Sequence, residues 1–302
     1  MEKIKILIGI LSYGSHNNEF KVENLHNRGY RNQDRCLKQV LSNYNSWDLS
    51  KYDLTIRMYV TDKYDVSEYT NINIEQKVYS EDLHVLLGWQ HRDWFIENRY
   101  NYDYFIWGEN DVLISQNTFE TWSKLDKNLP EERDILGLIL WEVKNGIGYG
   151  INQSSRWFNP EIQDLIQYNE DIFIHFTNPQ TACYLICKNK FNILLDEDLY
   201  TPTTINPRQD FKDGRNKWSE KYPKMGFPTN HPSGYIRSQP SCASEIYSKG
   251  RYRKLVSLKH YKDLLAHHLS GDYTNGKNGF TVEGCNINSN VLDELQIKYN
   301  LK

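Results

Sequence analysis

The chain has 302 residues, enough to bury a core that folds without disulfide bonds. Its composition, 39% hydrophobic and 25% charged, is that of a globular protein and excludes a disordered tail or a membrane protein. The 36 basic and 39 acidic residues are interspersed and nearly balance at a net charge of −3, so no broad positive face favours a nucleic-acid partner.

The first apolar run, Ile4 to Ser12, has lysines at its start (Lys3 and Lys5) as a secretion signal would, but no small-residue cleavage site comes after it. It is too short to span a bilayer, and nowhere does the chain approach about 18 consecutive apolar residues, so we predict no transmembrane segment. The five cysteines are scattered and odd in number, and we expect reduced thiols. These features favour a cytoplasmic protein and leave its oligomeric state open.

Strand and helix patterns alternate along the first part of the chain. The run Ile4 to Ser12 reads as a buried strand, the helical spacing of apolar residues from Asn32 to Tyr44 predicts an amphipathic helix, and Leu54 to Val60 predicts a second strand. This βαβ unit implies parallel pairing with a right-handed crossover. A weaker strand at Asn73 to Tyr79 and a helix at Leu83 to Asn98 continue the alternation.

Two apolar pieces, Tyr104 to Trp107 and Val112 to Ile114, come next, and an acidic turn separates them. A helix at Asn117 to Leu125 and a strand at Ile135 to Trp141 follow. The order predicts an α/β fold with a mostly parallel central sheet flanked by helices, a Rossmann-like arrangement.

After about residue 145 the alternation weakens. A buried run at Thr181 to Cys187 is followed by a stretch rich in Pro, Gly and Asn from Thr201 to Ser241, which is long for a connection and typical of a lid or binding loop. Without a repeat or a convincing linker, we interpret residues 1–302 as a single domain with an irregular C-terminal half.

The acidic turn, Gly108 to Asp111, is the most informative stretch. Ligands of open α/β sheets bind at the carboxyl ends of the strands, where Glu109 and Asp111 are expected. Two carboxylates one residue apart in a turn can converge on a hard divalent cation, and burying them without a cation would be unfavourable. Solvated surface acids are the alternative, but apolar runs on both sides hold this turn against the core.

The sequence YDYFIWGENDVLI, from Tyr102 to Ile114, resembles the region around the metal-binding DXD motif of GT-A glycosyltransferases. In that motif an aromatic, apolar strand leads into an acidic turn and a second short strand; here Glu109 stands at the first acidic position. The resemblance follows the order of elements from Ile4 to Trp141 and, more faintly, the C-terminal end. It implies Asp111 as the principal ligand of Mn²⁺ or Mg²⁺.

The segment LLAHHLSGDY near the C-terminus looks like the one from which many GT-A enzymes supply a histidine as a further metal ligand. Imidazole beside carboxylates suits manganese better than calcium. His267 and His268 are both candidates. The alternative is that both cap or pack the end of a helix.

The resemblance also implies nucleotide contacts at the end of the first strand and after the second. The matching positions hold Ser12, Tyr13 and Asp62, and Asn110 lies between the two acids of the turn. An ordinary strand-end loop is the alternative for each. Two arginines on predicted helices are candidates for neutralising phosphate or for solvating a helix face: Arg35 and Arg92.

An inverting transfer needs a carboxylate that takes the proton of the acceptor hydroxyl. Glu142, just after the strand ending at Trp141, is the first candidate for this base, and Asp210 and Glu245 are weaker ones. A structural salt bridge is the alternative role for each.

The predicted activity is metal-dependent transfer of a sugar from a nucleoside-diphosphate sugar, with a UDP-sugar as the expected donor, to a hydroxyl of a glycan or other acceptor. Residues 1–145 are the expected nucleotide-sugar and metal-binding half, and residues 146–302 the expected acceptor-binding half. A sugar nucleotidyltransferase and a non-catalytic glycan-binding module stay open as alternatives. The former usually has a Gly-rich phosphate loop after the first strand, where Gly14 stands alone here.

Overall fold

The computed structural model of the protein describes nine stretches of the chain. They are residues 2–12, 33–80, 87–88, 90–130, 134–151, 162–176, 182–196, 253–270 and 287–301.

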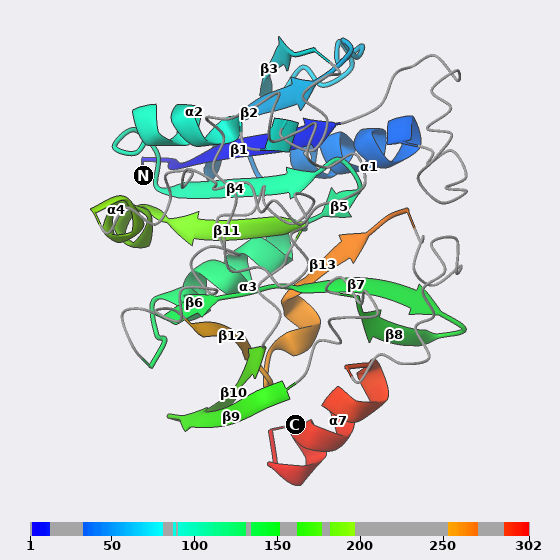
Figure 1. Ribbon diagram of the computed structural model, residues 1–302, viewed down its shortest axis with the longest axis vertical. Coiled ribbons are helices and arrows are strands. Elements are labelled where there is room, and N and C mark those ends of the chain that lie inside the picture. The colour runs from blue at the N-terminus through cyan, green and yellow to red at the C-terminus, as the bar shows by residue number, and fades with distance from the viewer. Residues whose placement is uncertain are drawn as a thin grey trace, which may run out of the picture.

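A five-stranded sheet of order β11-β4-β1-β2-β3 forms the upper half of the molecule in Figure 1. The first four strands along the chain are parallel to one another, and β11 joins antiparallel to β4. The bounds are β1 Ile4–Ser12, β2 Tyr52–Val60, β3 Asn73–Val78, β4 Tyr104–Glu109 and β11 Cys183–Cys187. The α/β fold with a mostly parallel central sheet is therefore confirmed.

Six helical segments accompany the strands in the described residues. They are α1 Gln33–Asn45, α2 His91–Glu97, α3 Gln116–Asp126, α4 Lys188–Asp196, the 3-10 turn η3 Tyr261–Asp263 and α7 Ser289–Lys298. Within that part of the chain, none is long and apolar enough to cross a membrane.

Two smaller four-stranded sheets lie below the first (Figure 1). The first has the order β5-β13-β7-β8, with β5 Val112–Leu113, β13 Leu265–His268, β7 Ile139–Lys144 and β8 Ile147–Gly150. The second has the order β6-β12-β10-β9, with β6 Asp134–Leu136, β12 Arg253–Ser257, β10 Asp171–Phe176 and β9 Ile162–Tyr168.

Helix α3 joins the upper sheet to a lower one. Ser115 caps its start by accepting a hydrogen bond from the Thr118 amide at 3.0 Å. On one side the ring of Phe119 packs edge-on against Tyr104 of β4, with centroids 5.1 Å apart. On the other, the Trp122 indole donates a 2.8 Å hydrogen bond to the carbonyl of Leu136 at the end of β6. The helix thus belongs to the core that lies between the sheets.

Three sequence-based expectations differ from the structure. The strand predicted at Ile135 to Trp141 is two strands, β6 and β7, which belong to different sheets. The break falls at Gly137, where an added Cβ would lie 2.5 Å from Cε of Lys254; the lysine stem crosses there, and only glycine leaves room for it.

The helix predicted at Leu83 to Asn98 is shorter, since α2 begins at His91, and Leu83 to Leu86 lie outside the described residues. The alternative that the two histidines cap the end of a helix is wrong, because they lie in strand β13, which pairs with β5 on one side and with β7 on the other.

Candidate metal and nucleotide-sugar site

The sheet order places a binding edge between β1 and β4. The chain runs outward from β1 through β2 to β3 and then returns to β4 on the other side of β1. Ligands of open α/β sheets bind outside the carboxyl ends of the strands at such a reversal. Ser12 ends β1, and the turn Glu109 to Asp111 ends β4, so both predicted groups lie at this edge.

Ser12 and Asn110 are hydrogen-bonded to each other at this edge. The Asn110 side-chain amide donates to Ser12 Oγ at 2.9 Å, and Ser12 Oγ donates to the Tyr64 hydroxyl at 2.8 Å. The Asn110 backbone amide also bonds the Leu11 carbonyl at 2.8 Å. Because Ser12 is 0% and Asn110 5% exposed, these contacts lock the acidic turn onto β1.

Tyr64 is a residue that the sequence analysis missed. It lies two positions after Asp62, the acid that follows β2, and that spacing from a strand-end acid is the only sequence signal for it. Burial raises the pKa of Tyr64, the Ser12 hydrogen bond opposes the shift, and the nearby charges of Asp34 and Asp62 add to it. The structure therefore brings Asp62 to the neighbourhood of Ser12 and Asn110.

The centre of the candidate site is a row of three buried side chains. His268 Nε2 lies 3.2 Å from Asp111 Oδ2, and His268 Nδ1 lies 2.5 Å from Glu142 Oε1. The side chains of His268, Asp111 and Glu142 are 4%, 2% and 1% exposed. An imidazole ring therefore separates two carboxylates in a region closed to bulk water.

Strand pairing assembles this row from three distant parts of the chain. Asp111 immediately precedes β5, and β13 pairs antiparallel with β5 through His268 and Val112. The Leu269 amide donates to the Asp111 carbonyl at 2.7 Å. On its other side β13 pairs parallel with β7, with His267 opposite Trp141, so the next residues of both strands, His268 and Glu142, share a face.

The two carboxylates set the protonation of His268. Burial lowers the pKa of the ring, but the charge and hydrogen bond of Asp111 and those of Glu142 outweigh it and raise the pKa to about 10. The two acids thus favour the protonated ring, and a cation bound at Nε2 would displace the proton from that nitrogen. Ser270 Oγ adds a contact of 3.2 Å to the ring.

The donor chemistry of this row fits a divalent cation. Carboxylate oxygen with imidazole nitrogen suits Mn²⁺ or Mg²⁺, and cations that also bind substrate phosphates need only one or two protein carboxylates. Asp111 and His268 Nε2 already face each other. Within the described residues, no three or more His, Cys, Asp or Glu side chains form a group that could hold a metal ion by themselves.

The other two predicted metal ligands, His267 and Glu109, lie within two residues of His268 and Asp111 in the sequence. Neighbouring residues of a strand point to opposite faces, so exposed His267 is directed away from the buried side of β13 that carries His268. His268 is thus the histidine that meets the acids. Glu109, half-buried at the end of β4, has its amide bonded to the Ala182 carbonyl at 3.1 Å, and its role as a ligand stays a prediction.

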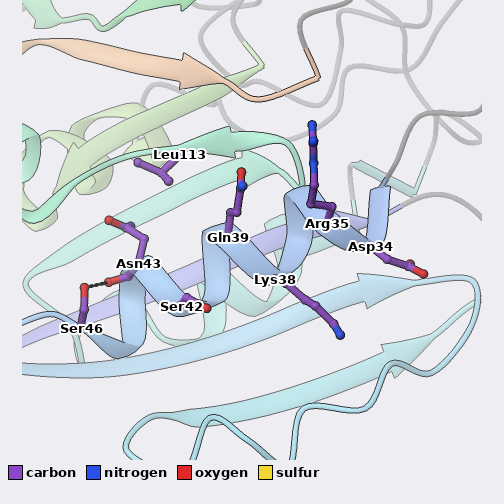
Figure 2. Close-up of a pocket in the computed structure, with 8 residues that line it drawn as sticks. All are labelled: Asp34, Arg35, Lys38, Gln39, Ser42, Asn43, Ser46 and Leu113. Atoms are coloured by element: carbon purple, nitrogen blue, oxygen red, sulfur yellow. Dashed lines mark hydrogen bonds between the residues drawn. The ribbon is translucent and has the colours of Figure 1, made fainter.

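The two predicted arginines differ in setting. Arg92 in α2 is 1% exposed. Burial of the neighbouring His91 lowers the pKa of that ring, and the charge of Arg92 lowers it further. Arg35 is exposed on α1 and lines an open groove of about 730 Å³ with Leu113 of β5. Figure 2 shows Arg35 and Gln39 on the side of α1 that faces Leu113, while Lys38 points away. Both assignments to phosphate stay predictions.

Three predicted site residues lie outside the described residues. They are Tyr13, Asp210 and Glu245.

The comparisons with known proteins find no matching family model and no matching curated protein. Among solved structures, S. aureus TarS aligns at 8% identity with a TM-score of 0.40, over 98% of this chain and 43% of that one. Mouse xyloside xylosyltransferase 1 aligns at 9% identity and a TM-score of 0.36, over 87% and 84%.

A glycosyltransferase involved in glycosylation of the major capsid of PBCV-1 aligns at 15% identity and a TM-score of 0.30, over 88% and 93%. The chain spans less than half the length of the full TarS chain and 50% of its 1–349 fragment. These likenesses are loose, so the proposals below rest on the residues of this chain.

Proposed function

We propose that this protein is a GT-A-type glycosyltransferase that moves a sugar from a nucleoside-diphosphate sugar to an acceptor hydroxyl, with Mn²⁺ or Mg²⁺ bound at the acidic turn. The observation that carries the proposal is the buried contact between Asp111 and His268 beside the carboxyl ends of β1 and β4. A metal-dependent nucleotide site needs oxygen and imidazole donors at that edge of a parallel sheet.

In this proposal Asp111 and His268 hold the cation, and Glu109 contributes from the end of β4. The cation, when bound, would neutralise the negative charge that develops on the departing diphosphate. Ser12, Asn110 and Tyr64 keep the turn fixed relative to β1, so that the carboxylate of Asp111 is held in place before the donor binds. Arg35 and Arg92 are the proposed partners of phosphate oxygens, and Tyr13 and Asp62 those of the base and ribose.

Calorimetric titration of UDP into the protein, with and without Mn²⁺, tests the proposal. We expect binding that requires the metal and is lost in Asp111→Asn, a variant of nearly the same size that lacks the charge. Glu75→Gln removes a carboxylate that is exposed on edge strand β3, and it should bind as the wild type does. Equal UDP binding without metal, or in Asp111→Asn, would refute the metal-dependent site.

Slow hydrolysis of the donor distinguishes the enzyme classes. A working transferase should release free sugar and UDP from a UDP-sugar in the presence of Mn²⁺, because water can replace the acceptor. A sugar nucleotidyltransferase would instead release the sugar phosphate when pyrophosphate is supplied. A glycan-binding module would do neither.

A further inference from the structure

Glu142 is a deeply buried acid of the candidate site. Its side chain is 1% exposed, and its Oε1 lies 2.5 Å from Nδ1 of His268. The opposite nitrogen of the same ring, Nε2, faces Asp111 Oδ2 at 3.2 Å. One carboxylate therefore lies behind the histidine, and the other lies in front of it on the side of the acidic turn.

The sheet fixes Glu142 more firmly than a loop would. Strand β7 is an inner strand that pairs with β13 on one side and with β8 on the other, where Glu142 lies opposite Tyr149. Pairing with β8 fixes Glu142 itself, and pairing with β13 fixes the preceding residue, Trp141, opposite His267, so the register of the two strands brings Glu142 next to His268.

A carboxylate accepts hydrogen bonds and donates none when ionised, so the contact with Glu142 keeps a hydrogen on Nδ1 of His268. The nitrogen available to a cation is then Nε2, which faces Asp111. A carboxylate bonded to the far nitrogen of a ligating histidine orients the ring and makes it a stronger ligand, and its loss typically weakens metal affinity about 10-fold to 100-fold.

We propose that Glu142 is a positioning residue: it holds His268 in the orientation and tautomer in which Nε2 and Asp111 bind the same cation. This inference rests on the proposed metal-dependent function and deepens it. It gives Glu142 a role other than the acceptor base expected from the sequence. A base must reach the acceptor hydroxyl, whereas the Glu142 side chain is buried and one of its oxygens is on the histidine.

The test measures Mn²⁺ affinity by electron paramagnetic resonance for the wild type, Glu142→Ala, Glu142→Gln and the exposed control Glu75→Gln. We expect Glu142→Ala to weaken Mn²⁺ binding about 10-fold to 100-fold, and Glu142→Gln to retain part of the affinity because its amide oxygen can still accept from Nδ1. The control should bind Mn²⁺ as the wild type does. Glu142→Gln is nearly isosteric, so it stays informative if Glu142→Ala does not fold.

Two spectroscopic readouts separate positioning from general stability. The ¹⁴N coupling of His268 to bound Mn²⁺ should weaken in Glu142→Ala, and the ¹⁵N shifts of the ring in the metal-free protein should show that Nδ1 has lost its hydrogen bond to a carboxylate. Wild-type Mn²⁺ affinity and unchanged ring shifts in both variants would overturn the proposal. The same result with donor turnover abolished in Glu142→Gln would assign Glu142 as the base instead.

A different result would show that the proposed function itself is wrong. A wild-type protein that binds no Mn²⁺ at all would remove the metal site and with it the role of Glu142 in metal binding. In that case the metal-free ring shifts of the two variants would still show whether Glu142 orients His268.

Discussion

Lys254 has an unusual environment for a lysine. It is 2% exposed in β12, its stem fills the space left by Gly137, and its ammonium nitrogen has no hydrogen-bond partner among the described residues. Burial lowers the pKa of Lys254 to about 7, and the nearby Cys183 thiol opposes the shift only in part. An unpaired buried amine of this kind destabilises the folded state.

Replacing Lys254 with Met should stabilise the protein by about 1–3 kcal/mol at pH 7, because it keeps the apolar stem and removes the amine. The gain depends on pH. Below pH 7 the amine is protonated in both states and the full penalty applies. Between pH 7 and the ordinary pKa of 10.5 the unfolded chain binds more protons, so the stability of the wild type rises with pH and the gain shrinks.

Urea denaturation at pH 6.5 and pH 9 measures this difference. Lys124→Met, at an exposed position of α3, is the matched control and should change stability by less than about 0.5 kcal/mol at both pH values. An equal gain from Lys254→Met at the two pH values would contradict the lowered pKa.

For single residues, the sequence pointed to Asp111 and the histidine pair, and the structure places His268 beside Asp111, while their role as metal ligands stays a prediction. Each of the two features is a local pattern: acids that follow a strand end, and a pair of histidines near the C-terminus. The resemblance to GT-A glycosyltransferases linked the two. It could not choose between His267 and His268, because that choice depends on which face of β13 is buried. Nor could it foresee that Ser12 and Asn110 bond each other, since 98 residues separate them.

Strand β8 needs a glycine at position 148, because the neighbouring strand places a tryptophan ring against it. An added Cβ would lie 2.1 Å from the indole of Trp141 in the neighbouring strand β7, a side chain that is 5% exposed. The indole thus occupies the space that a side chain at position 148 would need. Because Glu142 follows Trp141 directly, this contact also bears on the candidate site.

We expect Gly148→Ala to destabilise the protein by about 1–3 kcal/mol, since the indole must move or the strands must separate. Gly108→Ala is the control of the same type in β4, where an added Cβ would make an ordinary contact of 3.5 Å. Chemical denaturation followed by tryptophan fluorescence compares the two. Equal stability of both variants would show that Trp141 leaves the glycine without a penalty.

The elements that the sequence predicted best are those with long, regular patterns. The strand at Ile4 to Ser12 was predicted with its observed bounds because nine residues of near-continuous apolar character can only be a covered strand or a short helix segment. The strand at Ile135 to Trp141 was predicted as one element, because its composition is apolar throughout. The split at Gly137 arises from Lys254, more than 100 residues later, which no local pattern shows.

For the whole molecule, the candidate site lies where the upper sheet meets a lower one. Asp111 stands between β4 of the five-stranded sheet and β5 of the sheet that contains His268 and Glu142. A cation held by Asp111 and His268 would therefore strengthen a junction already made by the connection from β4 to β5, the hydrogen bond from the Leu269 amide to the Asp111 carbonyl, helix α3 and side-chain packing in the core. Ligand binding should then stabilise the fold as a unit.

Binding of the cation and the nucleotide should therefore raise the melting temperature. A ligand present at about 100 times its dissociation constant adds about 2.7 kcal/mol to the stability of a protein that binds it only when folded. For a chain of this length that corresponds to an increase in the melting temperature of about 4 °C. We expect UDP with Mn²⁺ to produce such an increase in differential scanning fluorimetry, and UDP or Mn²⁺ alone to produce less.

Variants at three acids test whether the increase in melting temperature comes from the candidate metal site. Asp111→Asn should abolish the increase that UDP and Mn²⁺ produce together, because the principal proposed carboxylate ligand loses its charge. Glu142→Gln should reduce it, and Glu75→Gln should leave it unchanged. If Asp111→Asn kept the full increase, UDP and Mn²⁺ would be binding elsewhere, and the junction between the two sheets would not be the metal site.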